Sequence, residues 1–187
     1  MYEASDLRKG LKIEIDGDPY TIVQFEFSKP GKGQALYRCK LKNMVNGNQF
    51  DRTYRSGDKF NEANLEEHEM EYLYKEKNKY CFMNTSTYEQ EFLDDNQLED
   101  SVNFLQENMK CQVLFFQDRP IGLTLPNFVE MTVTQSDPWV KGDTASGSTK
   151  PATVETGYTL QVPPFIEEGE QIRIDTRTGD YVERVKK

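Results

Sequence analysis

The stretch TIVQFEFSKPGKGQALYRCKLK, residues 21–42, contains two alternating runs joined by a short loop. Residues 21–27 and 35–42 each alternate apolar and polar side chains, which is typical of β-strands. The loop Ser28 to Gln34 contains one proline and two glycines, and this composition favours a β-hairpin with an extended tip. The stretch therefore predicts an antiparallel sheet at this end of the chain.

Lys32 lies at the tip of this loop, between Gly31 and Gly33. Because glycine has no side chain, nothing beside the lysine covers it, and the backbone can approach another surface closely. One interpretation is a plain, flexible hairpin turn. The other is a lysine presented for covalent modification or for insertion into a nucleic-acid site. The loop by itself does not decide between them.

The rest of the first third continues the same pattern. Residues 11–15 alternate, and Asn46-Gly47 is a strong signal for a two-residue hairpin through which residues 49–54 pair back. Four or five short antiparallel strands within about 60 residues predict a small barrel of the SH3-like, or KOW, kind.

Two further modules follow. Leu98, Val102 and Leu105 have helical spacing, so residues 95–105 predict a short helix among strands, which fits an OB-type barrel. The chain starts again after Pro126-Asn127 and predicts a second OB-type barrel that is almost purely β. We therefore expect an all-β protein of three small β-barrels in series, with domains at 1–64, 65–127 and 128–187.

The charge is distributed unevenly along the chain. Residues 1–60 contain 11 Lys and Arg against 8 Asp and Glu, residues 61–128 contain 5 against 14, and residues 129–187 contain 7 against 10. The formal net charge of −9 argues against a protein that coats nucleic acid indiscriminately. The basic first third nevertheless suggests a local surface that faces phosphate, with a solvated mixed face as the alternative.

Three basic residues of this first third share one face of the predicted strand 35–42. They are Arg38, Lys40 and Lys42, and they alternate with Tyr37, Cys39 and Leu41 on the other face. This face gives the basic patch a shape, next to the loop that carries Lys32.

Residues suited to catalysis, metal binding or membrane insertion are scarce. The single histidine, His68, lies in an acidic polar stretch without a partner at ligand spacing, so we expect an exposed residue at a junction and no metal. The three cysteines lack CxxC spacing, which indicates reduced thiols and a cytoplasmic protein. No apolar run is long enough to span a bilayer, and the N-terminus does not resemble a signal peptide. We expect no catalytic residues, no cofactor and no enzyme activity.

Several motifs resemble those of bacterial elongation factor P. Residues 29–35, Lys-Pro-Gly-Lys-Gly-Gln-Ala, are similar to the first-domain loop of that family, with Lys32 where the family carries its modified residue. The most specific stretch runs from Lys150-Pro151-Ala152 to Gly169 and agrees with the family at every spaced position. Residues 126–129 and 175–182 are also similar, so the resemblance covers the whole chain.

The resemblance implies an L-shaped, tRNA-like protein that binds the ribosome beside peptidyl-tRNA, contacts both subunits and relieves stalling at consecutive prolines. It implies that Lys32 is modified by a dedicated enzyme and is presented by Lys29, Pro30, Gly31, Gly33 and Gln34. It implies contacts of Gly142, Asp143 and Thr144 with messenger RNA, and of Tyr181 and Arg184 with the small subunit. The strand face of Arg38, Lys40 and Lys42 would meet RNA, and the protein would act as a monomer.

Two other families and two other classes of function stay open. The hypusine-bearing initiation factor of eukaryotes and archaea shares the first two domains, and a paralogue in some bacteria differs in the loop. The protein could instead be a ribosome-associated structural protein with passive RNA-binding barrels, or an enzyme on an OB scaffold. The acidic middle barrel should avoid phosphates, so we expect it to face solvent or a basic ribosomal protein.

Overall fold

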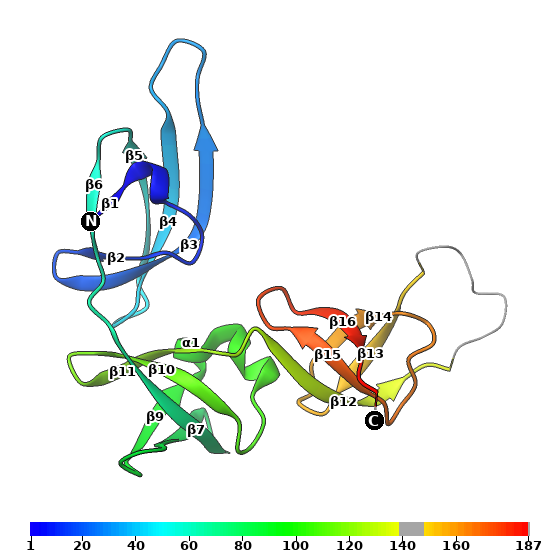
Figure 1. Cartoon of the computed structure of the whole chain (residues 1–187). Helices are drawn as coiled ribbons and strands as arrows, with labels where there is room; N and C mark the ends of the chain where they lie inside the picture. Colours follow the sequence, from blue (N-terminus) through cyan, green and yellow to red (C-terminus); the bar gives the residue numbers. More distant parts are fainter. Residues whose placement is uncertain (139–147, 187) are drawn as a thin grey trace.

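The computed structural model describes residues 1–138 and 148–186 and contains three antiparallel β-sheets (Figure 1). The first sheet has the strand order β1-β6-β2-β3-β4-β5. The prediction of an all-β fold is confirmed, with barrel-like sheets that follow one another along the chain. The elements of the first sheet are β1 (Tyr2–Glu3), the 3-10 helix η1 (Ala4–Asp6), β2 (Lys12–Ile15), β3 (Asp18–Ser28), β4 (Leu36–Asn43), β5 (Gln49–Arg55) and β6 (Lys59–Glu62).

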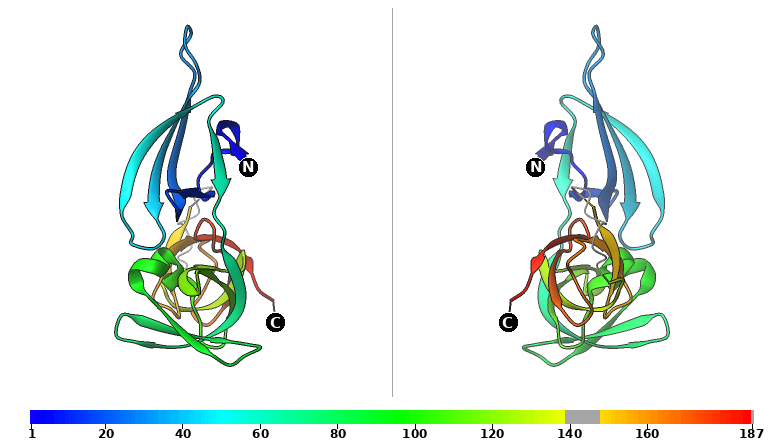
Figure 2. Two further views of the ribbon diagram at one scale, coloured as in Figure 1. Left: turned by 90° about the vertical axis from the view of Figure 1, so that its left-hand side faces the viewer. Right: turned by 90° about the vertical axis from the view of Figure 1, so that its right-hand side faces the viewer.

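The hairpin of β3 and β4 is the longest feature of this sheet. The two strands pair from Tyr20 opposite Asn43 to Ser28 opposite Leu36, with a β-bulge between Ile22 and Gln24. A β-bulge bends its strand and increases the local twist. Because β5 pairs with β4 from Leu36 opposite Arg55 to Lys42 opposite Gln49, only the loop between β3 and β4 extends past the rest of the first sheet, as both views of Figure 2 show.

The turns of the first sheet differ from the prediction in one place. Asp16 and Gly17 form a two-residue turn, both with positive φ (52° and 84°). At Asn46-Gly47, by contrast, the two-residue hairpin is wrong, because residues 44–48 form a five-residue loop in which only Gly47 has positive φ (79°). The side-chain oxygen of Asn43 shapes this loop by accepting from the backbone N–H groups of Val45 (2.8 Å) and Asn46 (3.1 Å).

The second sheet has the order β11-β10-β7-β8-β9. The predicted helix over residues 95–105 is wrong in extent: a single α-helical turn is followed by a 3-10 helix. Glu99 follows the α-helical turn with φ 51° and ψ −127°, a conformation that cannot continue an α-helix. The elements are β7 (Glu66–Glu76), β8 (Lys79–Asn84), β9 (Gln90–Asp94), α1 (Asp95–Leu98), η2 (Glu99–Phe104), β10 (Lys110–Phe116) and β11 (Arg119–Thr124).

The third sheet has the order β14-β13-β12-β15-β16 and its own apolar core. Met131, Ile172 and Ile174 are completely buried in that core. The elements are β12 (Phe128–Ser136), β13 (Lys150–Val154), β14 (Thr159–Val162), β15 (Gln171–Asp175) and β16 (Asp180–Arg184).

The second and third sheets share apolar contacts. Phe104 from η2 is buried in the core of the third sheet, and Met109 and Leu125 pack against the cores of both sheets. The Thr156 hydroxyl also donates to the carbonyl of Asn103 (2.5 Å). Because apolar burial is the largest stabilising term in such contacts, these two sheets form a joined pair.

The first and second sheets meet mainly through polar groups. The ammonium of Lys42 at the end of β4 forms an ion pair with Glu99 and donates to the carbonyl of Asn96 (3.5 Å). The Met44 side chain lies close to Gly122 in β11. Figure 1 shows the first sheet above the second and the third sheet beside it, which gives the molecule an L shape.

Candidate functional site

The loop between β3 and β4 presents Lys32 at the end of the projecting hairpin (Figure 1). The Pro30 carbonyl accepts from the N–H of Gly33 (3.2 Å), and this hydrogen bond closes a tight turn. The structure places the six predicted loop residues on the surface: Lys29, Pro30, Gly31, Lys32, Gly33 and Gln34 are all exposed. The Lys32 ammonium is thus carried on a narrow tip.

The fold itself does not require the glycines beside Lys32. Neither Gly31 nor Gly33 has a backbone φ in the left-handed region, whereas Gly47 in the neighbouring loop does. A Cβ added at Gly31 would meet nothing within 4 Å, and one at Gly33 would make ordinary contact with Pro30 at 3.6 Å. Neither the backbone angles nor the packing of this chain therefore requires glycine at these two positions.

The strand face next to the loop is more balanced in charge than the sequence predicted. In the strand register, Arg38 lies between Glu26 and Thr53, and Lys40 lies between Gln24 and Asp51. Cross-strand neighbours of opposite charge attract each other. Within the described residues, however, neither Arg38 nor Lys40 comes within ion-pair distance of a carboxylate. Both cations therefore remain available to a ligand.

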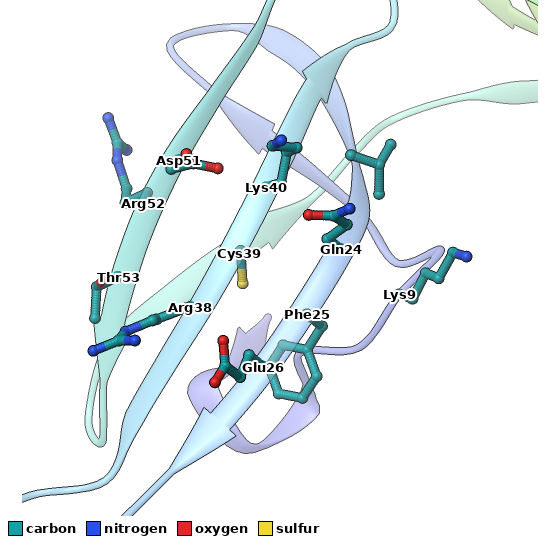
Figure 3. A pocket seen from close by; sticks show the side chains of 11 residues that line it. Lys9, Gln24, Phe25, Glu26, Arg38, Cys39, Lys40, Asp51, Arg52 and Thr53 are labelled. Atoms are coloured by element: carbon teal, nitrogen blue, oxygen red, sulfur yellow. The ribbon is translucent and has the colours of Figure 1, made fainter.

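A groove of about 710 Å³ runs over β3, β4 and β5 at this face (Figure 3). Figure 3 shows Gln24 and Lys40 on adjacent strands toward one end, and Glu26 and Arg38 toward the other. The charged residues that line the groove are Lys9, Arg38, Lys40, Arg52, Glu26 and Asp51. Arg52 pairs with the buried Cys39 in the register and lies over the Phe50 ring on the opposite face, so the cations of this face are Lys9, Arg38 and Lys40.

Two basic residues join this surface without having been assigned to it from the sequence. Backbone hydrogen bonds from Gly10 to Ile22 (2.8 Å) and from Ile22 to Leu11 (3.0 Å) hold the preceding Lys9 beside β3, and no sequence pattern signals that contact. Arg55 lies opposite Leu36 in the register and so shares the face of Arg38. For Arg55, the alternation of residues 49–55 predicts this face once the pairing of β4 with β5 is known.

Lys42 is placed apart from Arg38 and Lys40. Its side chain is 18% exposed and is engaged by Glu99 across the junction of the first two sheets. Burial lowers the pKa of the Lys42 ammonium, and the negative charge of Asp94 opposes that shift. The three basic side chains thus share one face of β4, but Lys42 serves the contact between the sheets.

The predicted residues of the last third are partly described. Tyr181 is half-buried against the core of the third sheet, and burial is the main cause that raises its pKa. The guanidinium of Arg184 donates to the Phe165 carbonyl (3.1 Å), pairs with Glu170 (3.3 Å) and lies over the Phe165 ring (4.7 Å). Gly142, Asp143 and Thr144 lie outside the described residues.

The remaining side chains that could take part in catalysis or metal binding are those of the three cysteines and the single histidine. Cys39, Cys81 and Cys111 are free and buried, and burial raises the pKa of Cys39 to about 11 and of Cys111 to about 12. His68 lies in β7 rather than at a junction, 3.4 Å from a Glu66 carboxylate oxygen and edge-on to Phe115. Over residues 1–138 and 148–186, no group of His, Cys, Asp and Glu is arranged to hold a metal ion. No helix in this described part could cross a membrane.

Comparison with known proteins gives a consistent result over the whole chain. Three family models match: "Elongation factor P (EF-P) KOW-like domain" over residues 3–60, "Elongation factor P (EF-P) OB domain" over 65–123 and "Elongation factor P, C-terminal" over 129–184. The chain is 68% identical over 185 residues to elongation factor P of Desulforapulum autotrophicum, covering 99% of both chains. It is 67% identical over 187 residues to that of Desulfosudis oleivorans, covering all of both chains.

A solved structure is also similar in part. It is titled eukaryotic translation initiation factor 5A from Methanococcus jannaschii, with 21% identity and a TM-score of 0.46. The match covers 66% of this chain and 93% of that one.

The geometry of the loop makes a prediction for the stability of glycine variants. Gly31→Ala should leave the free energy of unfolding unchanged or raise it by up to about 1 kcal/mol, because alanine fits this backbone and restricts the unfolded chain. Gly47→Ala is the matched control and should lower it by roughly 1–3 kcal/mol, since an alanine at φ 79° is strained. Urea unfolding of both variants measures the difference. A loss at Gly31 as large as that at Gly47 would show that the fold does need this glycine.

Proposed function

The chain belongs to the elongation factor P family, a family of translation elongation factors, and we propose that it relieves ribosomes stalled at consecutive prolines. In this proposal the protein binds the ribosome beside peptidyl-tRNA, and Lys32 is the residue that contacts the tRNA. The observation that carries the proposal is the exposure of Lys32 at the end of a hairpin that extends beyond its barrel.

The chemistry of proline explains what such a tip has to do. Proline is a secondary amine whose ring fixes φ near about −65°, so it is a stiff partner in peptide-bond formation. Correct placement of two reactants can lower a barrier by several kcal/mol without any new chemical group. A protein that positions the acceptor end of peptidyl-tRNA can therefore accelerate the step, while catalysis stays with the ribosome. We accordingly propose that the chain is not itself an enzyme.

Modification of Lys32 would suit this role. The loop offers an uncrowded ammonium, because a Cβ at Gly31 would meet nothing and the predicted loop residues are exposed. An added group would lengthen the reach of the side chain toward the sugar and phosphate groups of the tRNA. We propose that a dedicated enzyme attaches such a group in the cytoplasm.

The basic side chains near the loop provide a second contact. We propose that Arg38 and Lys40 face the tRNA or ribosomal RNA backbone, with phosphates entering the groove over β3 to β5. For Lys42 to join them, a phosphate would have to displace Glu99. A contact of Lys42 with RNA therefore requires the junction between the first two sheets to open.

The other two barrels complete the proposed placement on the ribosome. We propose the domains 1–64, 65–127 and 128–187, since no described sheet contains strands from two of these ranges. The middle range is the most acidic part of the chain and would face solvent or a basic ribosomal protein. Tyr181, Arg184 and residues 142–144 would lie toward the small subunit and messenger RNA, with one copy of the chain per ribosome.

Replacement of Lys32 tests the role of the tip. In translation of a template with consecutive prolines, Lys32→Ala should slow passage through the prolines about ten-fold or more, because the positioning contact is lost. Lys59→Ala is the matched control, as Lys59 is an exposed lysine of the same barrel outside the loop, and it should keep most of the activity. A template without consecutive prolines should not distinguish the variants. If Lys32→Ala relieves the stall as well as the unaltered protein, the tip has no such role.

Mass spectrometry of the protein from its native host tests the modification separately. The peptide that contains Lys32 should carry added mass at high occupancy, and the peptides that contain Lys9 or Lys42 should not. An unmodified Lys32 in nearly all molecules would refute the modification but would leave the role of the tip open to the translation assay.

A further inference from the structure

An aromatic cluster lies at the base of the Lys32 hairpin. In the barrel, the inner face of β3 and β4 carries the buried residues Ile22 and Leu41. Toward the loop the same face carries Phe25 and Tyr37, which are partly buried against that core, and Phe27, which lies directly opposite Tyr37. The ring centroids of Phe27 and Tyr37 are 5.1 Å apart, and those of Phe25 and Tyr37 are 6.3 Å apart. The inner face thus continues as an aromatic surface where the hairpin leaves its sheet.

Phe27 is 52% exposed, although its ring contacts Tyr37. An aromatic cross-strand pair stabilises a β-sheet, and this accounts for the contact between the two rings. It does not account for the half of Phe27 that remains in water. The exposed part of the ring is available to a second flat partner.

The surroundings of Phe27 differ from those of the other exposed aromatic rings in the described chain. Arg177 and Arg184 already lie over the rings of Phe128 and Phe165, at 5.3 and 4.7 Å. Tyr74, Tyr88 and Phe92 belong to the acidic second barrel, in a segment with a net charge of −9. Residues 27–38, by contrast, contain three basic residues and no acidic one: Lys29, Lys32 and Arg38.

We propose that Phe27, supported by Tyr37, is a stacking site for an unpaired nucleobase at the 3′ end of the tRNA that Lys32 approaches. Every nucleobase has a π face, so an aromatic side chain beside basic groups holds single-stranded nucleic acid with little dependence on sequence. The base would stack on the open part of the Phe27 ring, while Lys29, two residues further along the chain, meets a phosphate that flanks it. Tyr37 holds the ring in place from the opposite strand.

This site rests on the proposed function, because it needs the hairpin to lie beside peptidyl-tRNA. It adds a fixed contact a few residues behind the tip. With the 3′ end held at Phe27, Lys32 would reach the tRNA from a constant starting position. The aromatic pair is therefore a positioning element, and the lysine is the group that contacts the reacting end.

The test uses ribosomes halted at consecutive prolines, whose peptidyl-tRNA carries 2-aminopurine at an unpaired 3′ position. Stacking on an aromatic ring quenches this fluorescent base, so titration with the full chain reports the contact directly. Phe27→Leu keeps an apolar cross-strand contact with Tyr37 and removes the π face. This variant should raise the apparent Kd obtained from the quenching titration about ten-fold. Phe27→Tyr keeps the π face and should quench like the unaltered protein.

A matched control and a second readout separate the possible failures. Phe92→Leu alters another exposed aromatic residue, in the acidic barrel, and should leave the quenching unchanged. Cosedimentation with the ribosome is measured for every variant. If every variant cosediments normally, two results would overturn the stacking site alone. One is equal quenching by Phe27→Leu and the unaltered protein, and the other is no quenching by either. Absence of cosedimentation for the unaltered protein would refute the proposed function itself.

Discussion

The pairing of β3 with β4 is the interaction on which the rest of the first barrel and its loop depend. Inside the barrel this pairing places Ile22 and Leu41 in the core, where they are buried. The same ladder continues to Ser28 opposite Leu36, with β5 paired beside β4, and it carries residues 29–35 away from the body of the protein. A loop of such composition would be mobile on its own, and the paired strands give it a defined base.

The two junctions between the sheets differ in their physical character. Phe104, Met109 and Leu125 join the second and third sheets through apolar burial, which favours a fixed relative position. The first sheet meets the second through the ion pair of Lys42 with Glu99, whose side chains are 18% and 53% exposed, and through Met44 beside Gly122. The molecule thus combines two barrels that share an apolar junction with a first barrel that joins them through an ion pair and a methionine contact.

Much of the fold could be predicted from the sequence because most strands carry a regular alternation. The strand face that holds Arg38, Lys40 and Lys42 followed directly from that alternation. The sequence could not show that Lys42 is engaged by Glu99, since these residues are far apart in the chain. It also missed the break after α1, where Glu99 takes a positive φ that propensity does not predict, and the place of Lys9 beside β3. The aromatic surface at Phe27 depends on where the hairpin leaves its barrel, and alternation alone does not fix that point.

The glycines beside Lys32 are not explained by the fold of the loop. From the sequence they favoured a turn as much as a functional tip. Both glycines have backbone angles that other residues also adopt, and no neighbouring atom crowds them. The turn therefore does not require glycine at either position.

A cryo-electron microscopy map of this chain on a ribosome halted at consecutive prolines would show directly what the hairpin tip contacts. We expect the tip at Lys32 to contact the 3′ end of peptidyl-tRNA, with the third barrel toward the small subunit. A chain bound with residues 29–35 in open solvent, away from the tRNA, would contradict it.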